Sequence, residues 1–141
     1  MLFYTGGDRA AAAILNAQRQ RTRANTQTLL RLKAIVGEAE QMLGAAGPLA
    51  PFGNLLHEAW QLKKSLAAGI ATPLVDEAYA AALRAGATGG KLLGAGGQGF
   101  LLLFAAPDRH PAVRAALREL REVPLAFGND GSQIIFRTTD Q

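Results

Sequence analysis

Residues 86–104, GATGGKLLGAGGQGFLLLF, decide the fold that we expect for this chain. They place seven of the chain's 16 glycines within positions 86–99, on either side of the short apolar pair Leu92–Leu93 and directly before the apolar run 100–104. Glycine reaches positive φ without steric cost, so such a segment can form a tight connection between strands. We therefore predict a strand, a glycine loop and a second strand.

The glycine loop is the first candidate for a functional site, because successive N–H groups in such a loop can converge on an anion. We predict that a phosphate or phosphorylated ligand is bound by Gly94, Ala95, Gly96, Gly97, Gln98 and Gly99. Lys91 lies just before the loop, where it either meets a phosphate or is an exposed strand charge. A flexible hairpin turn without a ligand is the alternative for the loop itself.

The sequence argues against several better-known types of functional site, because their motifs are either absent or followed by the wrong secondary structure. Residues 94–99 fit GxGxxG, but the dinucleotide fingerprint requires a helix directly after it, and here the strand-like FLLLF follows. The P-loop sequence and the HRD and DFG signatures of protein kinases are absent. His57 has no second histidine at helical spacing, and neither serine lies in GxSxG. We therefore expect no metal site and no catalytic residue in this chain.

Before the glycine loop, the sequence predicts a strand and four helices. Residues 2–4 suit a strand that Gly6–Gly7 ends. Helices are expected over about residues 9–23 and 25–44, from Pro51 to Gly69, and from a Thr72 cap to Gly86. The second helix has an apolar stripe, expected to be buried: Leu29, Leu32, Val36, Ala39 and Leu43. The fourth has a similar stripe: Val75, Ala78, Tyr79 and Ala82.

After the loop, the pattern predicts a helix over residues 107–120, an edge strand over 123–127, a turn at 129–131 and a closing strand over 132–137. The whole chain, residues 1–141, is thus expected to form a single α+β domain. Its first part is rich in helices and its second part is an antiparallel sheet.

Composition restricts the class of protein. With no cysteine, the chain has neither a disulfide framework nor a thiolate nucleophile. The longest apolar run, residues 100–106, is too short to span a bilayer, and no signal peptide is evident, so we expect a cytoplasmic protein without membrane contact. The net charge of +4 permits an anionic ligand, but the basic residues at 19–23 have no interleaved aromatics. We therefore expect a solvated helix end there, and no nucleic-acid partner.

Four segments together resemble the C-terminal half of a GHMP-type small-molecule kinase. They are Phe3-Tyr4-Thr5-Gly6 with Arg9, the LHEAWQLK of residues 56–63, the glycine segment over residues 86–100, and GSQIIF over residues 131–136. Among such kinases the chain is most like the bacterial sugar kinases that act on D-glycero-D-manno-heptose 7-phosphate.

This resemblance implies a C-terminal domain with a ferredoxin-like antiparallel sheet. It places the third motif of the family at residues 91–99, near nucleotide phosphates and the acceptor. The implied reaction is transfer of the γ-phosphoryl group of ATP to a sugar hydroxyl, with Mg²⁺ as the metal of the complete enzyme. Arg9 and Lys91 are the implied contacts to a substrate phosphate.

Two residues of the chain depart from the family pattern, and one half of the family's kinases has no counterpart in the chain. Gln98 replaces a usual glycine, and Leu93 replaces a usual Ser or Thr. The N-terminal half of these kinases, with the main phosphate loop, the Mg²⁺ ligands and any catalytic acid or base, has no counterpart in the sequence. We therefore expect no turnover by this chain alone, and an exposed apolar face that permits homo-oligomers.

Two further hypotheses remain open on the sequence. The chain is alternatively a free-standing ferredoxin-like module that binds a small molecule or regulates without catalysis. It is otherwise an interaction subunit that completes a kinase encoded as a separate chain.

Overall fold

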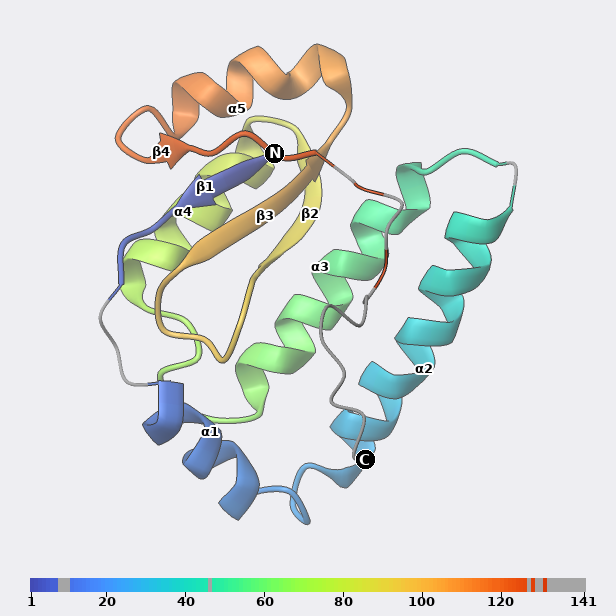
Figure 1. Ribbon diagram of the computed structural model, residues 1–141, viewed down its shortest axis with the longest axis vertical. Helices are drawn as coiled ribbons and strands as arrows, with labels where there is room; N and C mark the ends of the chain where they lie inside the picture. The colour runs from blue at the N-terminus through green and yellow to red at the C-terminus, as the bar shows by residue number, and fades with distance from the viewer. Residues whose placement is uncertain (8–10, 46, 127, 129–130, 132–141) are drawn as a thin grey trace, which may run out of the picture.

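The structure is a computed structural model that describes residues 1–7, 11–45, 47–126, 128 and 131. Its four strands are β1 (Leu2–Tyr4), β2 (Ala87–Leu92), β3 (Phe100–Ala105) and β4 (Arg121–Glu122). They form one antiparallel sheet in the order β2-β3-β1-β4 (Figure 1). This is the ferredoxin-like order that we predicted.

The helices lie in two of the connections between strands. Between β1 and β2 the chain forms α1 (Ala11–Gln20), α2 (Thr26–Gly44), α3 (Ala50–Ser65) and α4 (Pro73–Arg84). Between β3 and β4 it forms the 3₁₀ turn η1 (Pro107–Arg109) and α5 (His110–Ala116). The α+β class and the helix-rich first part are therefore confirmed, although the helix predicted over 107–120 is α-helical only as far as Ala116.

The core lies where α3, α4 and α5 meet one face of the sheet. Phe3 of β1 and Leu101 of β3 are opposite each other in the sheet, and both are fully buried. The entire predicted stripe of α4 is buried, and the Thr72 hydroxyl caps this helix by accepting a 3.4 Å hydrogen bond from the Val75 amide. The other large side chains that are fully buried are Trp60, Ile70, Leu92, Leu103, Val75 and Val113.

Glycine also sets how closely α3 approaches β2. A Cβ atom added at Gly89 would lie 1.8 Å from the Gly53 carbonyl oxygen, and one added at Gly53 would lie 2.0 Å from the Thr88 hydroxyl. Only glycine at both positions therefore allows this contact. Gly89 and Gly90 belong to β2, so the glycine loop is shorter than the glycine cluster in the sequence.

The buried stripe predicted for α2 is wrong. Ile35 is the buried residue of this helix, whereas Leu29, Val36 and Leu43 are exposed. The reason is that α2 lies at the edge of the molecule, and among the described elements its main neighbour is α3, along the side that carries Ile35 (Figure 1). A helix with one neighbour leaves part of its apolar surface in solvent.

The strand predicted over residues 123–127 is also displaced. The edge strand is β4, two residues earlier, and its ladder to β1 ends with a 2.8 Å hydrogen bond from the Val123 amide to the Leu2 carbonyl. Pro124 follows and has no N–H group, so it cannot continue the ladder. Phe127, most of the turn at 129–131 and the closing strand predicted over 132–137 lie outside the described residues.

Within the described ranges, no helix combines the length and the apolar character needed to cross a membrane.

Candidate functional site

The glycine loop connects β2 to β3 at one end of the sheet. The Leu93 amide donates a 2.8 Å hydrogen bond to the Phe100 carbonyl and closes the base of the hairpin. Positive φ values occur at four loop residues: Gly94, Gly96, Gly97 and Gly99. Because side chains rarely tolerate this conformation, the path of the loop depends on glycine.

Two parts of the loop are attached to the body of the domain through their amides. The Gly97 amide donates to the Ile70 carbonyl at 2.9 Å, and a Cβ atom at Gly96 would lie 2.9 Å from the Ile70 Cα. The Gly99 amide donates to the Thr5 hydroxyl at 3.1 Å, and the Thr5 amide donates to the Gly99 carbonyl at 2.8 Å. The loop is therefore held from the segment before α4 and from the end of β1.

Two side chains hold the loop through its carbonyl groups. Gln18 of α1 donates a 3.2 Å hydrogen bond to the Ala95 carbonyl, and the Lys63 ammonium of α3 donates to the Gly94 carbonyl. Sequence reasoning missed both roles: Gln18 belonged to a helix end that we expected to be solvated, and Lys63 to a motif without an assigned role. Neither residue lies near the loop in the sequence.

These attachments leave four amides of the loop unused. The N–H groups of Gly94, Ala95, Gly96 and Gln98 donate to no acceptor among the described residues, whereas those of Gly97 and Gly99 are occupied. A ligand would therefore find its donors at residues 94–96 and 98. Gly97 and Gly99 would contribute through the shape of the loop.

Positive charge gathers beside this loop. Burial, together with the charge of nearby Lys91, lowers the pKa of the Lys63 ammonium. In the described part of the chain, neither of these two lysines forms an ion pair with a carboxylate. An anion bound here would relieve the repulsion between the two ammonium groups. Arg9, the other predicted contact to a substrate phosphate, lies outside the described residues.

The lowered pKa of Lys63 predicts proton-linked anion binding. Sulfate keeps its charge from pH 7 to 10, so a fall in its affinity over this range would report loss of the lysine proton. We expect the fall to begin below the ordinary lysine pKa of 10.5, because the folded domain disfavours the charged form. Calorimetric titration with sulfate measures it, and Lys63→Gln is expected to flatten the profile. An unchanged pH profile in Lys63→Gln would contradict the assignment.

The two histidines and the tryptophan of the chain make contacts within the fold. His57 Nδ1 lies 2.8 Å from the Tyr79 hydroxyl, and burial raises the pKa of Tyr79 to about 12. Trp60 is fully buried, and the cation near its ring is Lys64, at 5.9 Å from the ring centroid. His110 contacts the Ala105 carbonyl at 3.2 Å. These contacts join α3 to α4 and α5 to the sheet.

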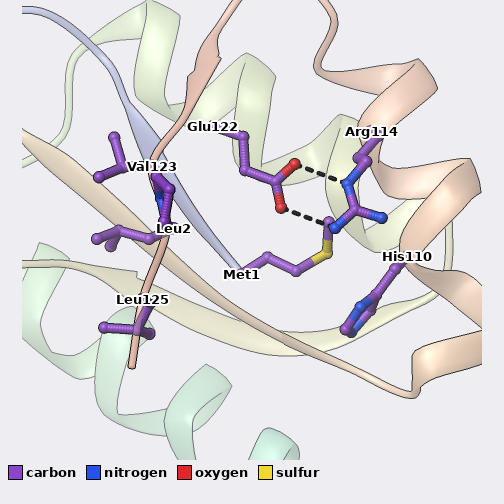
Figure 2. A pocket seen from close by; sticks show the side chains of 8 residues that line it. Met1, Leu2, His110, Arg114, Glu122, Val123 and Leu125 are labelled. Atoms are coloured by element: carbon purple, nitrogen blue, oxygen red, sulfur yellow. Dashed lines mark hydrogen bonds and ion pairs between the residues drawn. The ribbon is translucent and has the colours of Figure 1, made fainter. Parts of the chain in front are cut away.

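A hollow of about 540 Å³ lies at the start of β1, whereas the glycine loop meets the end of that strand. Figure 2 shows its charged groups engaged with each other: Arg114 Nε donates to Glu122 at 2.6 Å, which lowers the pKa of the Glu122 carboxyl. The residues around it are Met1, Leu2, His110, Arg114, Glu122, Val123, Pro124 and Leu125. This hollow offers a ligand few unpaired groups, so the glycine loop is the better candidate site.

Comparison with known proteins identifies the family. A family model described as GHMP kinases C terminal matches residues 31–124, more than half of the chain. The chain belongs to the GHMP kinase C-terminal domain family. The match runs from within α2 to beyond β4 and includes the whole glycine loop. A comparison with curated protein sequences found no significant match.

Solved structures share the fold of this GHMP domain. The mevalonate kinase of L. major, in complex with R-mevalonate, superposes with a TM-score of 0.70 and 23% identity over 84% of this chain. The Methanococcus jannaschii mevalonate kinase gives a TM-score of 0.69 and 22% identity over 85% of this chain. The chain spans only 37% and 36% of those two proteins.

Proposed function

We propose that this GHMP domain forms the phosphate side of the active site of an ATP-dependent kinase. The observation that carries the proposal is the set of four amides, at residues 94–96 and 98, that have no acceptor among the described residues, in a loop that other parts of the domain hold in place. Phosphoryl transfer depends mainly on positioning and on stabilising charge at the phosphoryl oxygens. Amides held in a fixed loop beside two lysines suit both requirements.

Each residue of the site has a proposed role. The amides of Gly94, Ala95, Gly96 and Gln98 donate to phosphate oxygens, and Gly97 and Gly99 set the path of the loop. Lys91 and Arg9 contact the phosphate group of the substrate, and Lys63 adds charge while it orients Gly94.

ATP would supply the phosphoryl group, with Mg²⁺ as the metal that family members generally use. Among the described residues, no group of three or more His, Asp or Glu side chains is placed to hold a metal ion. Our proposal assigns no Mg²⁺ ligand and no catalytic acid or base to this chain. These belong, in our proposal, to an N-terminal kinase half, and residues 1–141 alone do not turn over substrate.

For the acceptor, we propose a sugar phosphate of the heptose 7-phosphate type. The proposal rests on the resemblance of the segments at 3–6, 56–63 and 86–100 to kinases of that substrate. Lys63 and Lys91 also suit an acceptor that carries a phosphate of its own, because such an acceptor brings negative charge to the loop. The similarity to mevalonate kinases, at 22–23% identity, supports the shared fold and leaves the acceptor open.

Titration of the isotope-labelled chain with inorganic phosphate and with ATP tests the phosphate site by NMR. We expect the amide signals of residues 94–96 and 98 to shift, with smaller changes at Gly97 and Gly99. Lys63→Gln and Lys91→Gln are each expected to weaken binding about three- to tenfold, because a hydrogen bond to a charged group is lost.

Arg118→Gln is the control, because it removes one positive charge from an exposed position after α5 that belongs neither to the glycine loop nor to α2. Equal weakening in the control would reveal a nonspecific charge effect and contradict the site. So would the absence of shifts at residues 94–98 at millimolar ligand.

A further inference from the structure

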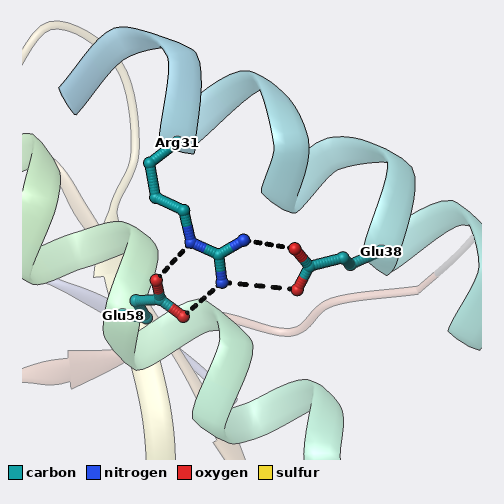
Figure 3. A network of polar contacts seen from close by, with 3 residues as sticks. All are labelled: Arg31, Glu38 and Glu58. Atoms are coloured by element: carbon teal, nitrogen blue, oxygen red, sulfur yellow. Dashed lines mark hydrogen bonds and ion pairs between the residues drawn. The ribbon is translucent and has the colours of Figure 1, made fainter. Parts of the chain in front are cut away.

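The outer side of α2 forms a surface that the phosphate site does not use. The inner side of this helix is fixed to α3, because the Arg31 guanidinium binds both Glu58 carboxylate oxygens, at 2.6 and 2.8 Å, and also Glu38 (Figure 3). Arg31 in turn lowers the pKa of the Glu58 carboxyl. The inner side of α2 is thus attached to α3, while its outer side carries exposed apolar side chains.

An apolar stripe runs along this outer side. Leu29, Val36 and Leu43 are 36%, 66% and 62% exposed. They are seven residues apart, so they lie almost in line along the helix. Exposed apolar side chains in a row, unlike scattered ones, are typical of a surface that packs against another helix.

Two charges accompany the stripe on one side. Lys33 and Glu40 are both exposed, and helical geometry places each of them next to the stripe on the same side of Val36. Neither forms an ion pair with another described residue. The stripe is thus flanked by a positive charge in its first half and a negative charge in its second half.

We infer that a second copy of this chain docks on this stripe, with the two α2 helices antiparallel. A twofold axis level with the Val36–Gly37 peptide brings Leu29 of one copy beside Leu43 of the other. The same rotation places Lys33 of each copy level with Glu40 of the other, on the same side of the contact. One symmetric interface thus covers both ends of the stripe and forms two opposite-charge pairs.

The charge pattern favours this arrangement over parallel pairing. In a parallel pair, the twofold axis runs along the helices and places the Lys33–Glu40 sides of the two copies on opposite sides of the contact, so that no opposite-charge pair forms across it. The self-complementary order of charges also favours a second copy over an unrelated partner. This inference stands independently of the proposed kinase function, because it uses no residue of the glycine loop.

Sedimentation velocity of the 141-residue chain, from low to high micromolar concentration, tests the inference. We expect a reversible monomer–dimer equilibrium. Lys33→Glu and Glu40→Lys each place like charges opposite each other twice, so each is expected to raise the dissociation constant about tenfold. Val36→Ser is also expected to weaken the dimer, while circular dichroism shows an unchanged helix content.

Restoration of the charge pairs is the decisive control. The double variant Lys33→Glu/Glu40→Lys is expected to dimerise as the parent does. An equimolar mixture of the two single variants is expected to form heterodimers, because both charge pairs then become attractive. A folded chain that stays monomeric at every concentration overturns the inference. In that case α2 serves a different partner. A dimer indifferent to these charge reversals overturns it as well.

Discussion

Gly89→Ala is expected to destabilise the domain by about 3 kcal/mol or more, the upper end of the cost of overpacking. The added Cβ atom would lie 1.8 Å from the Gly53 carbonyl oxygen and 2.7 Å from its carbonyl carbon. Both atoms belong to the backbone of α3, so no change of side-chain rotamer relieves the clash. The helix must move away from β2, and the packing of Trp60 moves with it.

Urea unfolding followed by circular dichroism measures this effect, with Gly37→Ala as the matched control. Gly37 lies inside α2, and a Cβ atom there meets nothing within 4 Å. The same change is therefore expected to stabilise the domain by up to about 1 kcal/mol, through helix propensity. If Gly89→Ala unfolds at the same urea concentration as the parent, the close contact of α3 with β2 is wrong.

Sequence reasoning predicted best those elements whose apolar residues are all packed against a neighbouring element. The stripe of α4 is buried along its whole length because α4 packs against the sheet on one side and against α5 on another. The strand–loop–strand at residues 87–105 follows from the change from glycine to apolar residues. The ferredoxin-like order required the resemblance to a family, since strand pairing is not encoded in local pattern.

The failures have physical reasons. The periodicity of α2 is real, but periodicity states which residues share a face and does not state whether that face has a neighbour. The edge strand was misplaced because alternation continues past Pro124, where hydrogen bonding to β1 cannot. In both cases the missing information lies in contacts with distant parts of the chain.

The candidate site was predictable in its loop and not in its supports. The glycine density located residues 94–99, and the charge next to them pointed to Lys91. The contacts from Gln18 and Thr5 join the loop to residues 77 and 94 positions away, and no single sequence shows such pairs. The amides of Gly97 and Gly99 are occupied by Ile70 and Thr5, and so these long-range contacts narrow the predicted set of six donors to four.

Gly96→Ala is expected to destabilise the domain by about 1–3 kcal/mol more than Gly94→Ala. Both residues have positive φ, at 124° and 77°, so both substitutions strain the backbone. Only at Gly96 does the new Cβ meet protein, lying 2.9 Å from both the Cα and the carbonyl oxygen of Ile70. At Gly94 nothing lies within 4 Å. The difference between the two variants therefore isolates the contact between the loop and Ile70.

The same pair of variants tests whether this contact fixes the geometry of the phosphate site. In Gly96→Ala the loop must move away from Ile70, which breaks the 2.9 Å hydrogen bond from the Gly97 amide and frees a fifth donor. If the number of free amides alone determined affinity, this variant would bind phosphate at least as well as the parent. We expect the opposite, a loss of at least about tenfold, because donors aimed at an anion are effective only when they are held in place. Hydrogen exchange of the Gly97 amide, compared with phosphate titration of both variants, separates these outcomes: faster exchange together with undiminished binding would contradict a preorganised loop.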